Sequence, residues 1–458
     1  MPEPSSPSAA SLTWRLSGAV PATIPADVLQ RQRLAALAAI GFLLGYYAMH
    51  NQWIQLGWIL AWTGIWLWQG GLQEWTECLR RDRWMRFMSV LLLVLLVRSS
   101  VLESPGITMK SLWLGWLGSG FLMASLMTLW AVARQPRSVV WLGVPLVGAA
   151  CLAALGSMMV FYVVGEGAVF GRRLQNWFIY GGWNQVCTGL TFGFAAIWAS
   201  WAWVRQSSQR EKWPWLLATL ILTLAALLTL SRGAVVALVA GHVAWVAVQG
   251  WRRTWRPVTL LLGCMTLFQL SAPFITDQGI QDVSRHLGVE PSRITSEMLA
   301  DGIVTADPAG RLLERGDNGR VEIYQAALQC MTTPRDWLIG KGLWADNDAW
   351  ACSLPWNPEH LHSIFVTVFV RGGLIGLLGL LLLWGWASLK AFRLARAGEE
   401  LWFILAVFGL FGVLFDGDDP FTLISVSRYE VLLVWVPLVA ASARELAANG
   451  FAKSDARL

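Results

Sequence analysis

Charged residues are scarce in this chain of 458 residues. Lys, Arg, Asp and Glu make up 14% of the sequence, whereas 55% of the residues are hydrophobic and the mean hydropathy is +0.50. A typical soluble domain has about a quarter of its residues charged. The composition therefore excludes an ordinary soluble protein and predicts a chain that lies largely in a lipid bilayer.

Histidine is rarer still, with five residues in the whole chain. Two of them stand together in Glu359-His360-Leu361-His362-Ser363, at the entrance to a long apolar segment. Titratable side chains at the edge of a hydrocarbon layer are costly to keep there and therefore mark candidate functional sites. We expect this stretch to be the chemical centre of a membrane enzyme.

A cleavable signal segment and an internal repeat are both missing from the sequence. Residues 1–32 are rich in Pro, Ser and Ala, and no short apolar run with a small-residue cleavage site precedes the first long apolar segment. We therefore expect residues 1–32 to form a flexible tail that stays in the cytoplasm. The lack of a repeat disfavours a transporter or flippase built from two related halves, the main alternative from another functional class.

Long apolar segments are abundant instead. A membrane-spanning helix needs about 20 apolar residues, and by that measure the chain holds about twelve such segments. The sequence thus predicts an all-α, multi-pass membrane protein. Thirty tryptophans, many of them near the ends of these segments, suit the aromatic belts at the two membrane surfaces. The predicted spans are 33–49, 53–69, 85–102, 111–133, 138–163, 185–204, 213–230, 234–250, 257–275, 362–388, 401–416 and 421–443.

Lys and Arg residues lie mainly in every second connection between the predicted spans. Basic residues near helix ends resist transfer across the membrane, so we expect the connections that hold them in the cytoplasm. Both termini then lie in the cytoplasm, and the net charge of +6 needs no nucleic-acid partner to explain it. The short outer connections hold only Lys110, Arg172, Arg173 and Arg232.

One connection on the outer side is much longer than the others. Residues 276–361 separate a first group of spans, 33–275, from a second group, 362–443, and residues 444–458 form a cytoplasmic C-terminal tail. Loops of this length in compact proteins are usually functional. We therefore expect the long loop to take part in the activity.

The long loop is expected to have some structure of its own. Apolar residues at helical spacing predict a surface helix from Asn318 to Met331, and Pro334 and later glycines predict an irregular segment after it. Cys330 and Cys352 lie in the same loop, and they could form a disulfide if the loop faces an oxidising compartment.

Two arginine sites on the outer side are candidates for binding an anion. Arg232 lies in the turn Ser231-Arg232-Gly233 between two apolar segments, where its planar guanidinium suits phosphate oxygens. The structural alternative is an arginine that only marks a helix end by reaching the lipid surface. Arg172 and Arg173, followed by Asn184, suggest a second anion contact, with solvated loop charges as the alternative.

Arg320 and His362 are two further candidates. Arg320 opens the predicted loop helix, where a cation opposes the helix dipole, and this favours an external reason for its presence. Arg311 and Arg315 compete for the same role. His362 carries an imidazole that can accept a proton from a hydroxyl group near neutral pH. The alternatives are a structural histidine at a helix start, or His360 as the active residue.

Acidic residues form two small groups outside the apolar segments. Carboxylate oxygens can bind a divalent metal ion, but neither group has a spacing that demands one, so we predict no metal site. Within the membrane, Arg371 and Glu430 need partners, and a pairing between them is one option. The two acidic groups are Asp346 with Asp348, and Asp416 with Asp418 and Asp419.

Taken in order along the chain, these residues resemble a known family, the bacterial O-antigen ligases. The relatives of that family are the O-antigen polymerases and the protein O-oligosaccharyltransferases. The two glycines that follow the histidine motif are expected to allow close helix packing below His362. The resemblance rests on His362-Ser363 with Gly373 and Gly376, on Ser231-Arg232-Gly233, on Arg320 with Tyr324, and on Arg173 with Asn184.

The resemblance implies a lipid-donor glycosyltransferase of the GT-C type, working on the periplasmic face of the bacterial inner membrane. The donor would be a glycan on undecaprenyl pyrophosphate. The acceptor would be a sugar of lipid A-core in a ligase, or a second lipid-linked glycan in a polymerase. Transfer would invert the anomeric centre without a metal ion or other cofactor. The implied catalytic residues are His362, Arg232 and Arg320, and the implied substrate contacts are Arg173, Arg172, Asn184, His360 and Trp356.

Overall fold

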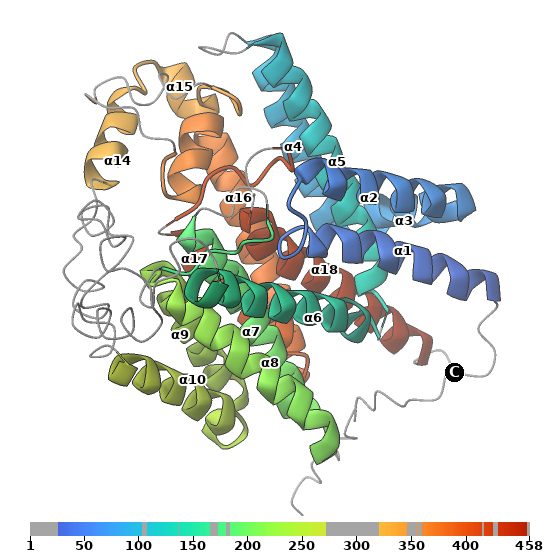
Figure 1. The fold of residues 1–458 in the computed structure, drawn as a ribbon. Coiled ribbons are helices and arrows are strands. Elements are labelled where there is room, and N and C mark those ends of the chain that lie inside the picture. Colours follow the sequence, from blue (N-terminus) through green and yellow to red (C-terminus); the bar gives the residue numbers. More distant parts are fainter. Residues whose placement is uncertain are drawn as a thin grey trace, which may run out of the picture.

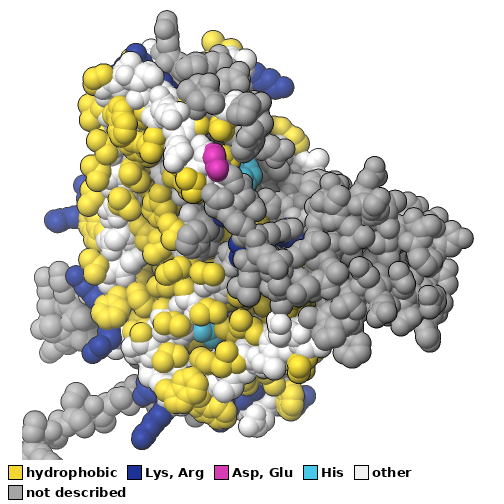
Figure 2. Space-filling model, turned by 90° about the vertical axis from the view of Figure 1, so that its left-hand side faces the viewer, with side chains coloured by type: hydrophobic (Ala, Val, Ile, Leu, Met, Phe, Trp, Pro, Cys, Tyr) yellow, Lys and Arg dark blue, Asp and Glu magenta, His cyan; other side chains and the backbone are white. Residues whose placement is uncertain are grey.

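The chain folds as an all-α, multi-pass membrane protein. The computed structural model describes residues 26–102, 108–135, 137–164, 173–179, 184–271, 320–345, 354, 360–414, 416–424 and 429–455, and these residues form helices but no strand. Figure 2 shows hydrophobic side chains over much of one face, with Lys and Arg side chains at its margins. Such a surface suits contact with lipid tails between two layers of headgroups.

Each predicted span overlaps a helix of the described residues (Figure 1). Eight helices in this part of the chain are long and apolar enough to cross a membrane. The predicted number of about twelve spans stays a prediction, because α17 (Leu401–Leu414) is short and three other helices do not meet the same test. The eight are α4 (Arg83–Val101), α5 (Met109–Ala133), α6 (Ser138–Met159) with the π-helical turn η2 (Val160–Val164), α7 (Gln185–Arg205), α8 (Gln209–Leu228), α9 (Arg232–Gln249), α16 (Ile364–Arg396) and α18 (Tyr429–Asp455). The three others are α1 (Ala26–Leu44), α2 (Gln52–Trp66) and α10 (Trp251–Ser271), and the turn η1 (Leu67–Gly71) joins α2 to the short α3 (Leu72–Arg81).

Helices α7 and α18 form the centre of the bundle. Within their apolar windows, 83% and 78% of the residues are buried, compared with 33% for α8 and α9. A helix with few lipid-facing residues must be covered by protein on most sides. The ends of these two helices therefore have fixed neighbours, and the candidate site lies beside one such end.

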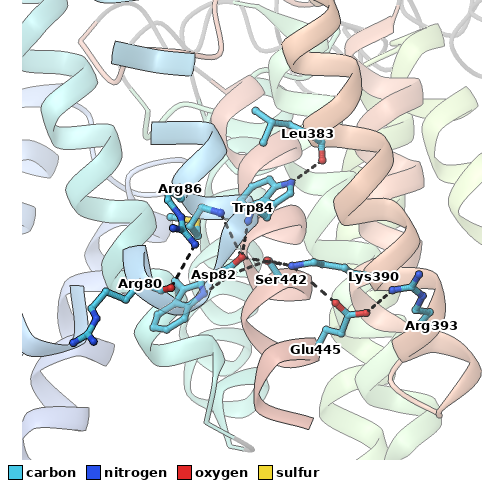
Figure 3. A network of polar contacts seen from close by, with 11 residues as sticks. Arg80, Asp82, Trp84, Arg86, Leu383, Lys390, Arg393, Ser442 and Glu445 are labelled. Carbon is cyan, nitrogen blue, oxygen red and sulfur yellow. Dashed lines mark hydrogen bonds and ion pairs between the residues drawn. The ribbon is translucent and has the colours of Figure 1, made fainter. Parts of the chain in front are cut away.

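A buried polar network joins four helices where α4 begins (Figure 3). Asp82 caps α4 by accepting a hydrogen bond from the amide of Trp84 at 2.9 Å. Its Oδ2 accepts from Trp130 Nε1 of α5 at 2.8 Å and from Ser442 Oγ of α18 at 2.6 Å. Lys390 Nζ of α16 donates to Ser442 Oγ at 2.6 Å and lies 3.5 Å from Asp82 Oδ1. Removing one partner from a buried charge pair is strongly destabilising, so this network fixes how the four helices meet.

Helix α16 is interrupted near its start. Gly373 has a φ of 62° and a ψ of −162° inside the helix. This break frees the carbonyl groups of Val370 and Arg371 from the helical amides that would otherwise bind them. The amides of Lys341 and Gly342 donate to these two carbonyls at 2.8 and 2.9 Å. The segment that follows α15 (Pro334–Ile339) is thereby docked against the break.

The docking requires glycine at two positions, because each of them lies directly against the backbone of the other segment. A Cβ atom on Gly373 would lie 2.4 Å from the carbonyl carbon of Leu338, and one on Gly340 would lie 2.4 Å from that of Arg371. Gly373 thus allows close helix packing, as expected, and its partner is the end of α15, a helix that the sequence did not predict. Gly376 does pack towards α4, as expected.

Two short helices lie in the long loop, next to the first turns of α16 (Figure 1). α14 (Arg320–Gln329) matches the predicted surface helix. α15 was not predicted, although the Thr333 and Asp336 side chains form a capping box at its start. Arg98 of α4 donates to the backbone carbonyls at the end of α15. The loop is thus attached to both α4 and α16.

The last predicted span begins too early. α18 begins at Tyr429, and residues 421–424 run along α5 outside any helix. Ser119 Oγ donates to the Phe421 carbonyl at 2.8 Å, and the Leu423 amide donates to the Gly118 carbonyl at 3.2 Å. These contacts satisfy the hydrogen-bonding groups of the backbone without a helix. An apolar composition alone cannot distinguish such a segment from the start of a helix.

Replacing Gly373 by alanine should destabilise the protein. Its backbone conformation is one that only glycine adopts readily, at a cost of about 1–3 kcal/mol to other residues, and the added Cβ would overlap the backbone of Leu338. We expect a clearly lower thermal unfolding midpoint in detergent. The matched control is Gly385→Ala in the same helix, where a Cβ would meet nothing within 4 Å. Equal midpoints for the two variants would contradict the docked break.

Candidate active site

Three segments that are far apart in the sequence converge on one carboxylate. They are residues 360–363 before α16, the first turn of α14, and residues 416–419 between α17 and α18. Asp416 lies where they meet, and only 5% of its side chain is exposed. A buried carboxylate requires polar partners, and three of the partners are residues that the sequence singles out.

Both histidines of the motif face the same oxygen of Asp416. His362 Nδ1 lies 3.0 Å from Asp416 Oδ1, and His360 Nε2 lies 3.6 Å from the same atom. The two imidazole rings are stacked at a tilt, with their centroids 4.0 Å apart. Their side chains are 23% and 29% exposed for His360 and His362. The carboxylate therefore forms the floor of the site and the imidazoles form its accessible edge.

Arg320 approaches the other oxygen of this carboxylate. Its NH2 atom lies 4.0 Å from Asp416 Oδ2, and 24% of its side chain is exposed. The structure thus brings His360, His362 and Arg320 together around Asp416. A guanidinium that keeps part of its surface accessible can still bind an anion.

The backbone of the site is held by two tyrosines. Tyr429 Oη donates to the Asp416 carbonyl at 2.6 Å, and Tyr324 Oη donates to the His362 carbonyl at 3.3 Å. His362 itself has a φ of 53°. A non-glycine residue in this left-handed region is uncommon and is often found at functional sites. The strained backbone directs the imidazole towards Asp416 at the very start of α16.

Electrostatics keep Asp416 ionised. Burial alone raises the pKa of its carboxyl group, but the contacts with His360 and His362 outweigh burial and lower this pKa to about 2. Burial lowers the pKa of His360, yet the nearby carboxylate of Asp416 raises it above its ordinary value. The site therefore holds a fixed negative charge next to two imidazoles at neutral pH.

Arg371 holds the segment that carries Asp416. Its NH2 and NH1 atoms lie 3.4 Å from Asp418 Oδ1 and 3.4 Å from Asp419 Oδ2, respectively. Glu430 Oε1 accepts a hydrogen bond from the Asp418 amide at 2.7 Å. The pairing of Arg371 with Glu430 considered from the sequence is therefore wrong. These acidic residues position the segment through side-chain contacts from two neighbouring helices.

Arg232 lies at the start of α9, and its neighbours connect it to the Asp416 region. Ser231 caps α9 by accepting from the Ala234 amide. Gly189 of α7 packs directly against the turn that contains Ser231, and the next residue, Leu190, packs against Gly412 near the end of α17. The same turn of α7 thus touches both the arginine turn and the helix that leads to Asp416.

Arg173 and Asn184 have structural partners. Arg173 donates to the carbonyls of Thr229 and Leu230 at 3.0 and 3.4 Å, beside the arginine turn. Asn184 caps α7 by accepting from the Val186 amide at 2.8 Å. Their roles as substrate contacts stay predictions. Arg172, Arg311, Arg315, Asp346, Asp348, Cys352 and Trp356 lie outside the described residues, whereas Cys330 is disulfide-bonded.

Asp416 is the functional candidate that the sequence reading missed. The sequence places it only in a group with Asp418 and Asp419, because a separation of 54 positions from His362 carries no information about contact. The available signal was an acidic residue at the outer end of an apolar segment, on the same predicted side as His362. Such a signal is weak without a structure.

The site offers two kinds of chemistry. If Nδ1 of His362 donates its proton to Asp416, the lone pair on Nε2 is available to accept a proton from a substrate hydroxyl. Arg320 supplies positive charge for a substrate anion. The ligand atoms of His360, His362 and Asp416 also lie within 4.8 Å of one another, as a metal-binding set would. The prediction of no metal site stays a prediction.

A comparison with known protein families matches part of this chain. Residues 217–381 match the family described as O-antigen ligase. The matched stretch contains Arg232, Arg320, His360 and His362, and it ends before Asp416. A search of curated proteins found no match.

Asp416→Asn should lower the pKa of His360. The substitution removes the negative charge that raises this pKa, and burial of the imidazole then dominates. Titration of histidine-labelled protein by NMR can follow the few imidazoles individually. Asp419→Asn in the same segment is the matched control and should leave the His360 pKa nearly unchanged. An unaltered His360 titration in the Asp416 variant would contradict the described contact.

Proposed function

Because the chain is a member of the O-antigen ligase/polymerase superfamily, we propose that it transfers a glycan from undecaprenyl pyrophosphate to a sugar of lipid A-core. The observation that carries the proposal is the hydrogen bond between His362 and the buried Asp416, with Arg320 alongside. A base fixed by a carboxylate, next to an anion-binding cation, suits attack of a hydroxyl on a phosphate-activated sugar.

The proposed reaction begins with His362. Its Nδ1–H donates to Asp416, which fixes the tautomer and leaves the Nε2 lone pair for the acceptor. Nε2 takes the proton of the acceptor hydroxyl while that oxygen bonds to the anomeric carbon. The bond from the anomeric carbon to the phosphate oxygen breaks, and undecaprenyl pyrophosphate leaves with the bonding electron pair. Attack from the face opposite the leaving group inverts the anomeric centre, and Asp416 stabilises the imidazolium that forms.

The proposed leaving-group site consists of arginines. Arg320 lies within the His362 and Asp416 cluster, and Arg232 lies at the start of α9. Their guanidinium groups would bind pyrophosphate oxygens and stabilise the charge that develops as the bond breaks. In this mechanism the arginines supply the positive charge, and no metal ion is needed. Arg172 and Arg173 are proposed as additional contacts to the pyrophosphate, and Asn184 as a contact beside them.

The proposed orientation follows from the distribution of Lys and Arg. Both tails, 1–32 and 444–458, lie in the cytoplasm of a bacterial cell, and the loop 276–361 lies in the periplasm above the inner membrane. The two groups of spans, 33–275 and 362–443, form a lipid-donor transferase of the GT-C type. Tryptophans of the long loop, including Trp356, would present flat apolar faces to the sugars.

An O-antigen polymerase is the nearest alternative, because the superfamily contains both activities. A polymerase uses the same donor chemistry but takes a second lipid-linked glycan as acceptor. The banding of lipopolysaccharide discriminates between the two. Loss of a ligase leaves lipid A-core without a glycan cap, whereas loss of a polymerase leaves caps of a single repeat.

His362→Ala and Arg232→Ala should each abolish glycan transfer while the protein remains in the membrane. The first variant lacks the base, and the second lacks a proposed anion contact to the leaving group. Lipopolysaccharide purified from cells that carry only the variant is the readout. His50→Ala, at an exposed position between α1 and α2, is the histidine control. Near-normal glycan caps with the His362 variant would rule out the assignment.

Asp416→Asn should reduce transfer by about 10²-fold or more, because an amide cannot enforce the imidazole tautomer or stabilise the imidazolium. Purified protein, lipid-linked glycan and lipid A-core allow the rate to be measured directly. Asp419→Asn is the control within the same segment, and its rate should fall much less. If the two variants lose activity equally, the loss reflects disturbance of the segment, and the proposed role of Asp416 fails.

A further inference from the structure

His360 has no defined part in the proposed proton transfer, yet it points at the same carboxylate oxygen as His362. We propose that His360, His362 and Asp416 form a regulatory site for Zn²⁺ or a similar transition-metal ion, which inhibits the enzyme when it binds. The metal site follows from the geometry alone. The inhibition rests on the proposed function of His362.

The distances between the three ligand atoms suit a tetrahedral ion. Zn²⁺ binds nitrogen and oxygen ligands at about 2.0–2.2 Å, so two ligand atoms of a tetrahedral site lie about 3.3 Å apart. The separations from Asp416 Oδ1 are 3.0 Å to His362 Nδ1 and 3.6 Å to His360 Nε2. All three atoms lie within 4.8 Å of one another. Small side-chain rotations would complete the site.

The ligand types select the class of metal. Two imidazoles and one carboxylate suit Zn²⁺ and its neighbours in the first transition row, whereas Mg²⁺ and Ca²⁺ prefer oxygen ligands alone. The imidazoles are partly exposed, so an ion from solution can reach them without opening the helix bundle. The remaining coordination position would be taken by water.

Arg320 does not occupy the position of the ion. It approaches Asp416 Oδ2, whereas the two imidazoles face Oδ1. An ion between the imidazoles and Oδ1 would therefore replace the proton held there and leave the arginine contact in place. The positive charge of Arg320 opposes the ion, so we expect weaker binding than at a structural zinc site.

Metal binding would remove the base. A neutral imidazole carries one N–H, which in the active arrangement is on Nδ1 of His362. When the ion takes the Nδ1 lone pair, that proton must lie on Nε2 or leave to solvent. A metal-bound imidazole is a neutral ring with one N–H, so the proton of His362 then lies on Nε2. His362 then has no lone pair for the acceptor hydroxyl.

Direct binding tests the metal site without reference to activity. The full-length protein, purified in detergent and freed of metal with a chelator, is titrated with Zn²⁺ against a chromophoric zinc indicator. We expect one ion per chain, and at least about tenfold weaker binding in His360→Ala and Asp416→Asn. His50→Ala is the matched control and should bind like the wild type. Absence of binding, or equal binding by the His360 variant, would overturn the site.

Transfer assays then test the inhibition. Zn²⁺ should inhibit the wild type, the chelator should restore its rate, and Mg²⁺ at the same concentration should not inhibit. Each variant is compared with its own metal-free rate. His360→Ala should need at least about tenfold more Zn²⁺ for the same fractional loss. Zinc binding without any effect on transfer would overturn the regulation, whereas zinc binding by a protein that transfers no glycan would overturn the proposed function and leave the metal site intact.

Discussion

Gly340 and Gly373 bring two stretches of backbone so close together that neither position has room for a Cβ atom. The contact sits at a break in α16, and the break exposes the carbonyls of Val370 and Arg371 to amides from outside the helix. A helix that ran without interruption would use those carbonyls internally. The glycine pair therefore converts part of a membrane helix into a docking surface for the long loop. The segment that follows α15 is therefore held at a fixed position relative to His362, which lies at the start of the same helix.

The same region of α16 also positions Asp416, the carboxylate of the site. Arg371 lies beside the break, and its side chain pairs with Asp418 and Asp419 in the segment after α17. The segment thereby holds Asp416 opposite His362. One element thus positions both members of the hydrogen-bonded pair, the histidine through its own N-terminus and the carboxylate through Arg371. Precise placement of a catalytic group depends on such supporting contacts.

The sequence predicted the parts of this arrangement that hydropathy and local chemistry control. Long apolar segments must become helices in lipid, because no other local structure satisfies the hydrogen-bonding groups of the backbone there. His362 is a candidate because a titratable side chain at the membrane end of a helix is costly to keep there unless it has a function. Contacts between distant residues were not predictable. Asp416 lies 54 positions from His362, and the partner of Gly373 lies in a loop whose path no periodicity reveals. The hydrogen bonds from Arg173 to the carbonyls of Thr229 and Leu230 could not be predicted either.

The two ends of α16 both carry a buried charge pair, but the pairs differ in how accessible they are. At the Lys390 end, Asp82 is 2% exposed and Lys390 8%, and their hydrogen bonds are made with residues that are also buried. Such a network specifies the packing of helices but offers no atom to a substrate. At the other end, Asp416 is equally buried, yet 29% of the His362 side chain is exposed. The buried carboxylate fixes the ring through one nitrogen, and exposure leaves the other nitrogen within reach of a ligand. Access to the paired residue, more than the buried charge itself, separates a structural charge pair from a reactive one.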